Sequence, residues 1–324
     1  MQAPEFWRGD AHSPWPLLLA PAAALYRLGF RLRQGFARPA RAPVPVICAG
    51  AATVGGAGKT PLVLTLARRL SAQGRKVHIL TRGYGGRLSG PVRVDPASHD
   101  AGAVGDEALL LAEAAPTWVA RDRVAGARAA AAAGAELLLL DDGLQNPTLA
   151  KDLSFLVVDG AHGFGNGRLL PAGPLREPVA AAAARVQAVV IVGPDRAGIT
   201  AMLPSRLPRL AARLIPVNGE TLAGRRCVAF CGIGAPEKFW ASLKQIGADI
   251  AFSRAFPDHH PYGDAELAAL RAEAARRGAT LVTTRKDWMR LAPDRRREVA
   301  VLEVELRFED EAALDRLLAA SLGR

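Results

Sequence analysis

The hydrophobic pattern of the chain alternates between short apolar runs and longer stretches with apolar residues every three or four positions. The short runs predict buried strands, and the longer stretches predict amphipathic helices. Strand, helix and strand in alternation are typical of a parallel sheet with right-handed crossovers and helices on its faces. We therefore expect an α/β fold in which ligands bind at the carboxyl ends of the strands. The first strands are expected at residues 44–49, 77–80, 118–120, 136–140, 155–158 and 189–192.

The stretch after the first predicted strand is rich in glycine and leads directly into a helix that is expected to begin at Lys59. Glycine allows several backbone N–H groups to converge on phosphate oxygens, and the start of a helix adds positive partial charge. Lys59 would reach the β- and γ-phosphates of a nucleotide, and Thr60 would ligate Mg²⁺. Thr53 replaces the first glycine of the usual P-loop pattern, so an ordinary glycine-rich turn is the alternative. The residues expected to bind the nucleotide here are Thr53, Val54, Gly55, Gly56, Ala57, Gly58, Lys59 and Thr60.

A second signal for nucleotide binding is the run of leucines at 137–140, which ends in Asp141 and Asp142. A buried parallel strand delivers a carboxylate to the Mg²⁺ of a bound nucleotide in this way. We expect Asp141 to hold Mg²⁺ directly or through water, with Asp142 beside it. The alternative is an acidic turn that simply follows a strand.

The alternation of strands and helices resumes after residues 204–223, a segment rich in proline and glycine that we interpret as a connection. The pattern predicts a P-loop NTPase-type parallel sheet flanked by helices over residues 43–220. A second, smaller α/β domain is expected over residues 221–324. Its strands are expected at 227–231, 250–252, 280–284 and 299–304, and a last helix follows them.

The amino-terminal residues 1–42 have a different composition. No charged residue occurs from Ser13 to Tyr26, whereas five arginines lie between positions 27 and 41. The apolar run is shorter than the roughly 20 residues that span a bilayer, and no basic segment of a signal peptide precedes it. We expect an amphipathic helix that associates with a membrane, with arginines on anionic headgroups. A terminal helix that packs on the protein body is the alternative.

The net charge of +11, from 42 Lys and Arg against 31 Asp and Glu, favours an anionic partner. A nucleotide, a phosphorylated substrate, a phospholipid surface and a nucleic acid all satisfy this condition. The three cysteines, Cys48, Cys227 and Cys231, have neither a disulfide framework nor the C-x-x-C spacing of a zinc or redox site. They are expected to be buried free thiols.

Other polar motifs of the first domain lie at predicted strand ends and stay open on spacing alone. The loop Arg82–Gly86 is a substrate loop or a flexible turn, and Arg121–Arg123 holds either a phosphate or an acidic side chain. Asp106 and Glu107 precede a predicted helix, where acidic residues usually cap the helix or interact with its dipole. The irregular segment 166–178 has the length of a functional loop, with Arg176 and Glu177 as its candidates.

The predicted second domain contains one such motif, Asp258–His260. It is a metal site, a proton-transfer site or a turn that leads into a helix. A metal site needs a further ligand that the sequence does not identify, so acid–base chemistry is the more specific functional hypothesis.

Taken in order, the motifs resemble one family closely, the tetraacyldisaccharide 4′-kinases of lipid A biosynthesis. The resemblance covers nearly the whole chain, and threonine at position 53 is a feature of that family. It rests on T-V-G-G-x-G-K-T-P at Thr53–Pro61, R-G-Y-G-G at Arg82–Gly86, G-D-E at Gly105–Glu107, D-D-G-x-Q at Asp141–Gln145, P-A-G-P-L-R-E-P at Pro171–Pro178, F-x-D-H at Phe256–His259 and R-K-D at Arg285–Asp287.

The resemblance implies Mg·ATP-dependent transfer of the γ-phosphoryl group to the 4′-hydroxyl of a tetraacyldisaccharide 1-phosphate. This reaction would take place at the cytoplasmic face of the bacterial inner membrane, and we expect the chain to act there as a monomer. The resemblance also implies that Asp106 and His259 act as a catalytic dyad together with Lys59. It suggests roles near the nucleotide and the metal for Glu107, Arg123, Gln145 and Glu177.

Two other functions are weaker fits. P-loop ATPase switches of the cell-division type carry lysine where this chain has Val54. A nucleic-acid-binding protein is favoured only by the charge, since no RNA or DNA module is recognisable. We expect no nucleic-acid partner.

Overall fold

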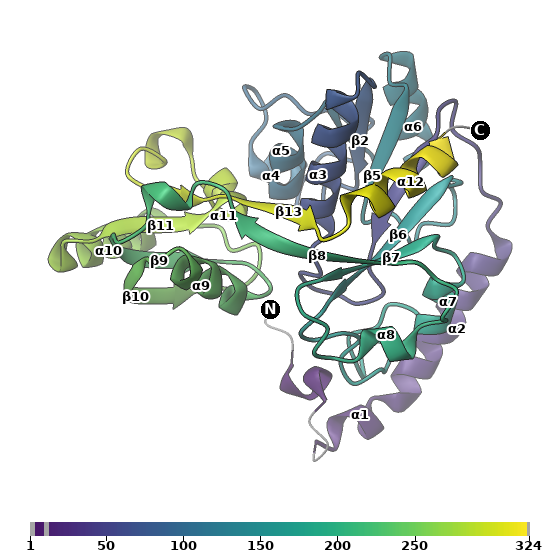
Figure 1. Cartoon of the computed structure of the whole chain (residues 1–324), viewed down its shortest axis with the longest axis horizontal. Helices are drawn as coiled ribbons and strands as arrows, with labels where there is room; N and C mark the ends of the chain where they lie inside the picture. Colours follow the sequence, from purple (N-terminus) through teal and green to yellow (C-terminus); the bar gives the residue numbers. More distant parts are fainter. Residues whose placement is uncertain (1–3, 10–12, 323–324) are drawn as a thin grey trace.

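The structure is a computed structural model that describes residues 4–9 and 13–322. Its larger sheet consists of β1 (Val46–Gly50), β2 (Val77–Thr81), β3 (Val92–Arg93), β4 (Thr117–Val119), β5 (Leu137–Asp141), β6 (Leu153–Asp159), β7 (Ala188–Val192), β8 (Arg209–Pro216) and β13 (Val304–Phe308). The strand order is β13-β8-β7-β6-β1-β5-β2-β4-β3 (Figure 1). Neighbours from β8 to β4 run parallel, and the edge strands β13 and β3 are antiparallel to their neighbours. The predicted α/β fold with a parallel sheet is confirmed.

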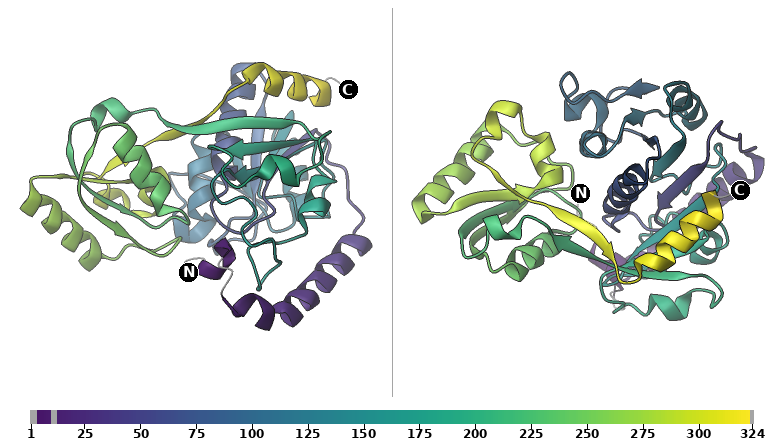
Figure 2. Two further views of the ribbon diagram at one scale, coloured as in Figure 1. Left: turned by 60° about the horizontal axis from the view of Figure 1, so that its bottom comes forward. Right: turned by 45° about the horizontal axis from the view of Figure 1, so that its top comes forward.

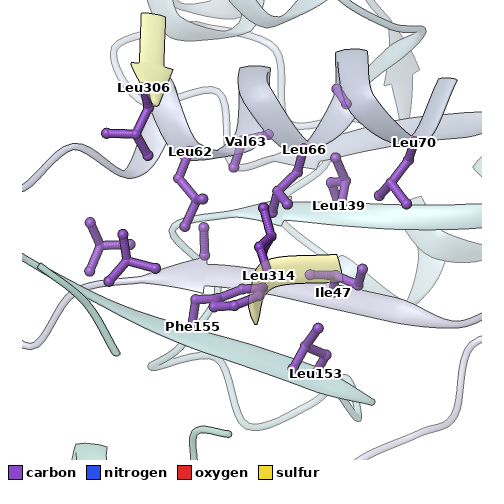
Figure 3. Packing of buried hydrophobic residues seen from close by; sticks show 14 of the residues in the cluster. Ile47, Leu62, Val63, Leu66, Leu70, Leu139, Leu153, Phe155, Leu306 and Leu314 are labelled. Atoms are coloured by element: carbon purple, nitrogen blue, oxygen red, sulfur yellow. The ribbon is translucent and has the colours of Figure 1, made fainter. Parts of the chain in front are cut away.

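Helices cover both faces of this nine-stranded sheet. They are α3 (Lys59–Ala72), α4 (Ala101–Val104), α5 (Asp106–Ala112), α6 (Arg123–Ala132), α7 (Val179–Ala183), α8 (Ile199–Met202) and α12 (Glu311–Leu322). Leu62, Leu66 and Leu70 of α3 recur every four residues and are almost completely buried, as the amphipathic pattern requires. Figure 3 shows them pointing toward the strands that carry Ile47 and Leu139. This core holds the start of α3 against the end of β1.

A second sheet of four parallel strands lies beside the first (Figure 2). Its strands, in the order β10-β9-β11-β12, are β9 (Arg226–Cys231), β10 (Asp249–Ala255), β11 (Thr280–Thr284) and β12 (Ala300–Leu302). Its helices are α9 (Pro236–Gln245), α10 (Asp264–Arg277) and α11 (Arg285–Arg290). Elsewhere and here the chain also forms short 3₁₀ helices, namely η1 (Glu5–Arg8), η2 (Gly219–Thr221) and η3 (Pro293–Arg295). α11 packs against α5 of the first sheet, so the two sheets contact each other there.

The structure corrects two parts of the expected organisation. Residues 204–223 are not only a connection, because they contain β8, which pairs with β7 and with β13. The expected strand 299–304 divides at Glu303 into β12 in the four-stranded sheet and β13 in the nine-stranded sheet. Leu306 and Leu314 then join the larger core, so the chain from 304 to 322 lies outside the predicted second domain. Hydrophobic pattern alone does not say which of two sheets a strand joins.

The amino-terminal helix α2 (Ala20–Phe36) follows the single turn α1 (Trp15–Leu18) and lies along the outside of the protein (Figure 2). None of its residues is buried. Tyr26, Phe30 and Gln34, spaced by four, are half-buried and face the body, and Gln34 donates a hydrogen bond to the Gln145 carbonyl. Its large apolar residues Leu25, Leu28, Leu32 and Phe36 are exposed.

By helical spacing, these exposed apolar residues fall on the side of α2 opposite to Tyr26 and Phe30. Packing on the body therefore uses one face of the helix and leaves its apolar face open. Among the described residues, no helix has the length and apolar character needed to cross a bilayer.

Candidate functional site

The glycine-rich loop connects the end of β1 to the start of α3, at the carboxyl edge of the parallel strands. Gly58 precedes the helix with φ of 101°, which only glycine adopts easily. A Cβ added at Gly55 or Gly56 would meet no atom within 4 Å. The first turn of α3 also lacks a side-chain cap among the described residues. Backbone amides at the start of the helix are thus open to an anion.

The segment 171–178 braces this loop. The Val54 amide donates to the Pro174 carbonyl at 2.9 Å, and the Arg176 amide donates to the Ala52 carbonyl at 2.7 Å. Thr53 forms an isolated bridge with Leu175. Backbone pairing therefore holds the irregular segment beside the glycine-rich loop, which explains why a stretch without regular structure has a defined position.

Asp141 ends β5 directly beside β1, and its side chain is buried. Its Oδ1 atom has no hydrogen-bond partner among the described residues. Burial raises the pKa of Asp141 well above its usual range, and the nearby carboxylates of Glu107 and Asp142 raise it further. A carboxylate without a partner among other carboxylates is a site that a hard cation would stabilise.

Asp142 has a φ of 55° and turns toward cationic side chains. One Nη of Arg176 lies 2.8 Å from both of its oxygens, and Lys59 Nζ lies 3.8 Å from Oδ1. Burial alone would raise the pKa of Asp142, but the charges of Lys59 and Arg176 outweigh it and lower the pKa. Lys59 and Asp142, predicted from separate motifs, are therefore neighbours.

Asp106 is the first residue of α5, and its buried carboxylate meets His259 from the second sheet. His259 Nδ1 lies 3.0 Å from Asp106 Oδ2, although 152 residues separate the two in the chain. The pKa of Asp106 falls below its usual range, because the hydrogen bond with His259 and the charges of Lys286 and Arg290 overcome the effect of burial. His259 has φ of 60°, a conformation that is uncommon for residues with a side chain and concentrated at functional sites.

Lys286, from the R-K-D motif, contacts Glu107 of the first sheet's α5 and the Asp258–His259 loop of the second sheet. Its Nζ lies 3.0 Å from Glu107 Oε1 and 3.6 Å from Asp258 Oδ1. It also lies 3.4 Å from His259 Nε2. Burial alone would lower the pKa of Lys286, but the surrounding carboxylates outweigh it and raise the pKa. The ammonium group therefore stays charged between the dyad and Glu107.

Three residues that were expected near the nucleotide or the metal contact other protein groups in this structure. Glu177, expected as a metal ligand, is fully buried and forms an ion pair with Arg185 instead. Gln145, expected near the nucleotide, donates to Glu177 Oε1 at 2.7 Å and to the Ala51 carbonyl at 2.8 Å. Arg123 is buried at the start of α6 and donates to the Ala120 carbonyl.

The expected Mg²⁺ set of Thr60, Asp141, Asp142 and Glu177 is thus only partly together. No group of three or more His, Cys, Asp or Glu side chains in the described part of the chain has the arrangement of a metal site. Asp142 is held by Arg176 and Glu177 by Arg185, so Asp141 is the carboxylate that fits a cation best. Nucleotide phosphates commonly complete the coordination of Mg²⁺, which binds few protein carboxylates.

Sequence reasoning missed the roles of two residues in this site, Lys286 and Arg290. The R-K-D motif contains Lys286, but its spacing gave no chemistry to that residue. Arg290 follows four positions later, on the same face of α11, and its Nε donates to Asp106 Oδ2 at 2.6 Å. The only signal was this i, i+4 pair of cations, which is common on solvated helix faces.

The chain matches a known protein family over nearly its whole length. Residues 15–323 match the family model described as tetraacyldisaccharide-1-P 4′-kinase. The chain belongs to this family. It is 55% identical to the tetraacyldisaccharide 4′-kinase of Rhodospirillum centenum, over 99% of this chain and 97% of the relative. It is 54% identical to that of Gluconacetobacter diazotrophicus, over 98% of this chain and 97% of the relative.

A solved structure of a tetraacyldisaccharide-1-P 4′-kinase also matches this fold. The crystal structure of LpxK from Aquifex aeolicus in complex with ATP superposes with a TM-score of 0.77 and 28% sequence identity. The match covers 95% of this chain and 99% of that one. The family resemblance stated from the motifs is confirmed, and the chain is a kinase.

Proposed function

We propose that this kinase transfers the γ-phosphoryl group of ATP to the 4′-hydroxyl of a tetraacyldisaccharide 1-phosphate, in lipid A biosynthesis. One observation carries the proposal beyond family membership. Lys59 lies 3.8 Å from Asp142, next to Asp141, and, besides burial, the charges of Glu107 and Lys286 shift the pKa of Asp141. Lys286 also contacts His259 of the Asp106–His259 pair, so the glycine-rich loop and this pair belong to one site region. A phosphate-binding element and a proton acceptor are the two parts that such a transfer needs.

In the proposed reaction, Lys59 and the first amides of α3 bind the phosphates of ATP. The acceptor oxygen forms a bond to the γ-phosphorus while the bond from that phosphorus to the β–γ bridging oxygen breaks, and ADP leaves. The acceptor proton passes to the Asp106 carboxylate, which His259 orients. Asp141 and Thr60 would hold Mg²⁺ together with the phosphates, and Asp142 lies nearby. The ion would neutralise the negative charge of the phosphates. Both the donor and the acceptor residues come from one chain, which supports action as a monomer.

The test is a kinase assay with the purified full-length protein, Mg·ATP and a tetraacyldisaccharide 1-phosphate. We expect ADP and a bisphosphorylated lipid in equal amounts, with the new phosphate at the 4′ position. ATP turnover that ignores the lipid and responds only to a protein partner would contradict the proposal. The same assay with an unacylated disaccharide 1-phosphate separates recognition of the sugar from recognition of the acyl chains.

We further propose that α2 places the kinase on the cytoplasmic face of the inner membrane, where ATP and the lipid are both accessible. The support is the exposed apolar side of α2, which includes Leu25 at 71% exposure and Phe36 at 83%. Arg27, Arg31 and Arg33 flank this side and suit anionic headgroups. The hydrogen bond from Gln34 to Gln145 connects the other side of the helix to the site region.

Replacing Leu25, Leu28 and Leu32 together with serine should release the protein from vesicles that contain phosphatidylglycerol. We expect the partition coefficient to fall by more than about tenfold, because each leucine loses apolar burial. Co-sedimentation measures the effect. The matched control replaces Met202 and Val217, which are exposed elsewhere on the protein, with serine and should bind as the wild type does. Equal binding by the leucine variant would show that α2 is not the membrane contact.

A further inference from the structure

Arg290 is the last residue of α11, which packs beside the four-stranded sheet. We call that sheet and its helices the four-stranded half of the protein. The guanidinium of Arg290 contacts the carboxylate of Asp106, which belongs to the other half, built on the nine-stranded sheet. The Arg290 side chain is 5% exposed, and its Nε donates to Asp106 Oδ2 at 2.6 Å. Asp106 itself is 4% exposed. A charged contact this well buried between two sheets is strong only when both partners are held in place.

The four-stranded half holds Arg290 firmly. Its Nη1 donates to Asp287 Oδ1 at 2.8 Å and to the Gly232 carbonyl at 2.9 Å. Asp287 is completely buried and also accepts hydrogen bonds from the Tyr262 hydroxyl at 2.6 Å and the Gly232 amide at 2.7 Å. The Asp287 of the R-K-D motif thus serves to fix Arg290.

The Asp106 carboxylate, which Arg290 contacts, accepts hydrogen bonds from both halves of the protein. The Glu107 amide donates to Oδ1 at 2.8 Å, while Arg290 donates to Oδ2 and His259 Nδ1 lies within 3.1 Å of both oxygens. The cation of Lys286 adds to the field at Asp106 without a direct hydrogen bond. Two of the three donors come from the four-stranded half, so the orientation of Asp106 depends on the contact between the two halves.

We propose that Arg290 is a positioning residue, which orients the Asp106 carboxylate toward the acceptor hydroxyl when α11 is docked on α5. This inference rests on the proposed function. It makes proton acceptance conditional on the contact between the two halves, because Arg290 is anchored in one half and acts on the other. Asp287 and Tyr262 act through Arg290 in turn.

Arg285 provides a matched comparison. It lies on the same helix and also reaches the end of α5, where its Nε donates to Oε2 of Glu113, the residue that follows α5, at 3.1 Å. It contributes to the docking of α11 on α5 but does not contact Asp106. A role for Arg290 in docking alone predicts that each variant loses kcat only to the extent that it loses thermal stability, whereas positioning of Asp106 predicts a loss of kcat in Arg290→Met beyond that extent.

The first experiment compares Arg290→Met, Arg290→Lys and Arg285→Met in the lipid kinase assay. We expect Arg290→Met to lower kcat by about 10- to 100-fold, the effect of losing one charge-assisted hydrogen bond, with KM for ATP unchanged. Arg290→Lys should recover part of the loss, and Arg285→Met should keep kcat near the wild-type value. Equal losses in Arg290→Met and Arg285→Met would overturn the proposal. Thermal unfolding of each variant checks that it is folded.

The second experiment introduces Arg290→Met into Asp106→Asn protein. If Arg290 acts through Asp106, the additional loss in kcat disappears in this background, because the carboxylate to be positioned is already absent. Losses that multiply would show that Arg290 acts elsewhere. A wild-type protein without activity on the lipid would instead overturn the proposed function, and this inference with it. The two failures are therefore distinguishable.

Discussion

Lys59→Met is expected to lower kcat by about 10³-fold while leaving the protein folded. Lys59 is the first residue of α3, and its side chain is 12% exposed. Its Nζ lies 3.8 Å from Asp142 Oδ1. Negative charge moves onto the β–γ bridging oxygen during transfer, and a fixed ammonium group stabilises that charge more than it stabilises bound ATP. Methionine keeps a flexible side chain of similar length, one atom shorter, and removes the ammonium group.

Lipid kinase kinetics measure this effect, and thermal unfolding confirms the fold of the variant. The control is Lys76→Met, because Lys76 is 71% exposed and pairs with Glu136 at the surface. The control should retain kcat and KM. If Lys59→Met instead raised KM for ATP at unchanged kcat, Lys59 would contribute to binding the ground state and not to the transition state.

Asp106→Asn is expected to lower kcat by about 10²- to 10⁴-fold, the range that a general base contributes. Asparagine is nearly isosteric with aspartate but cannot accept a proton at neutral pH, and it removes one of the two carboxylates that pair with Arg290. KM for ATP should change little, because the contacts of Asp106 lie on the acceptor side of the site. Asp294→Asn, the same change at an exposed position, serves as the control. Unchanged kcat in Asp106→Asn would reject the dyad.

The same variant tests the electrostatics of Asp106 through folding. Because the pKa of Asp106 is depressed in the folded state, its ionisation stabilises the fold above the ordinary aspartate value. This stabilisation should be lost as the pH falls below about 4. The free energy of unfolding, measured with urea between neutral and acidic pH, should fall less steeply in Asp106→Asn than in the wild type. Identical pH dependence would mean that the ion pair with Arg290 and the hydrogen bond with His259 are weaker than their geometry indicates.

The donor side of the site was largely predictable, because local sequence carries it. Gly55 and Gly58 have positive φ in a loop that leads into a helix, and Asp141 follows a run of leucines that forms a buried strand. Both motifs sit at the ends of neighbouring parallel strands, β1 and β5. The rules of parallel sheets therefore bring them together without further information.

The acceptor side of the site, formed by Asp106, His259 and Arg290, was harder to predict, because its residues are far apart in the sequence. Spacing alone favoured a helix cap for Asp106, and only the family resemblance linked it to His259. Nothing local distinguishes Arg290 from Arg285 on α11, although one contacts Asp106 and the other Glu113. The role of Glu177 as a metal ligand stays a prediction, and its buried ion pair with Arg185 was not visible in the motif.

The sequence by itself determined the α/β fold, the glycine-rich loop between a strand and a helix, the family and the amphipathic character of the amino terminus. These features depend on local periodicity and backbone preference, which neighbouring residues specify. Tertiary structure decided that β8 and β13 join the larger sheet and that Arg290 contacts Asp106. Side chains far apart in the sequence meet only after both sheets have formed and α11 has packed on α5. Their pairing is a property of that packing and not of either segment.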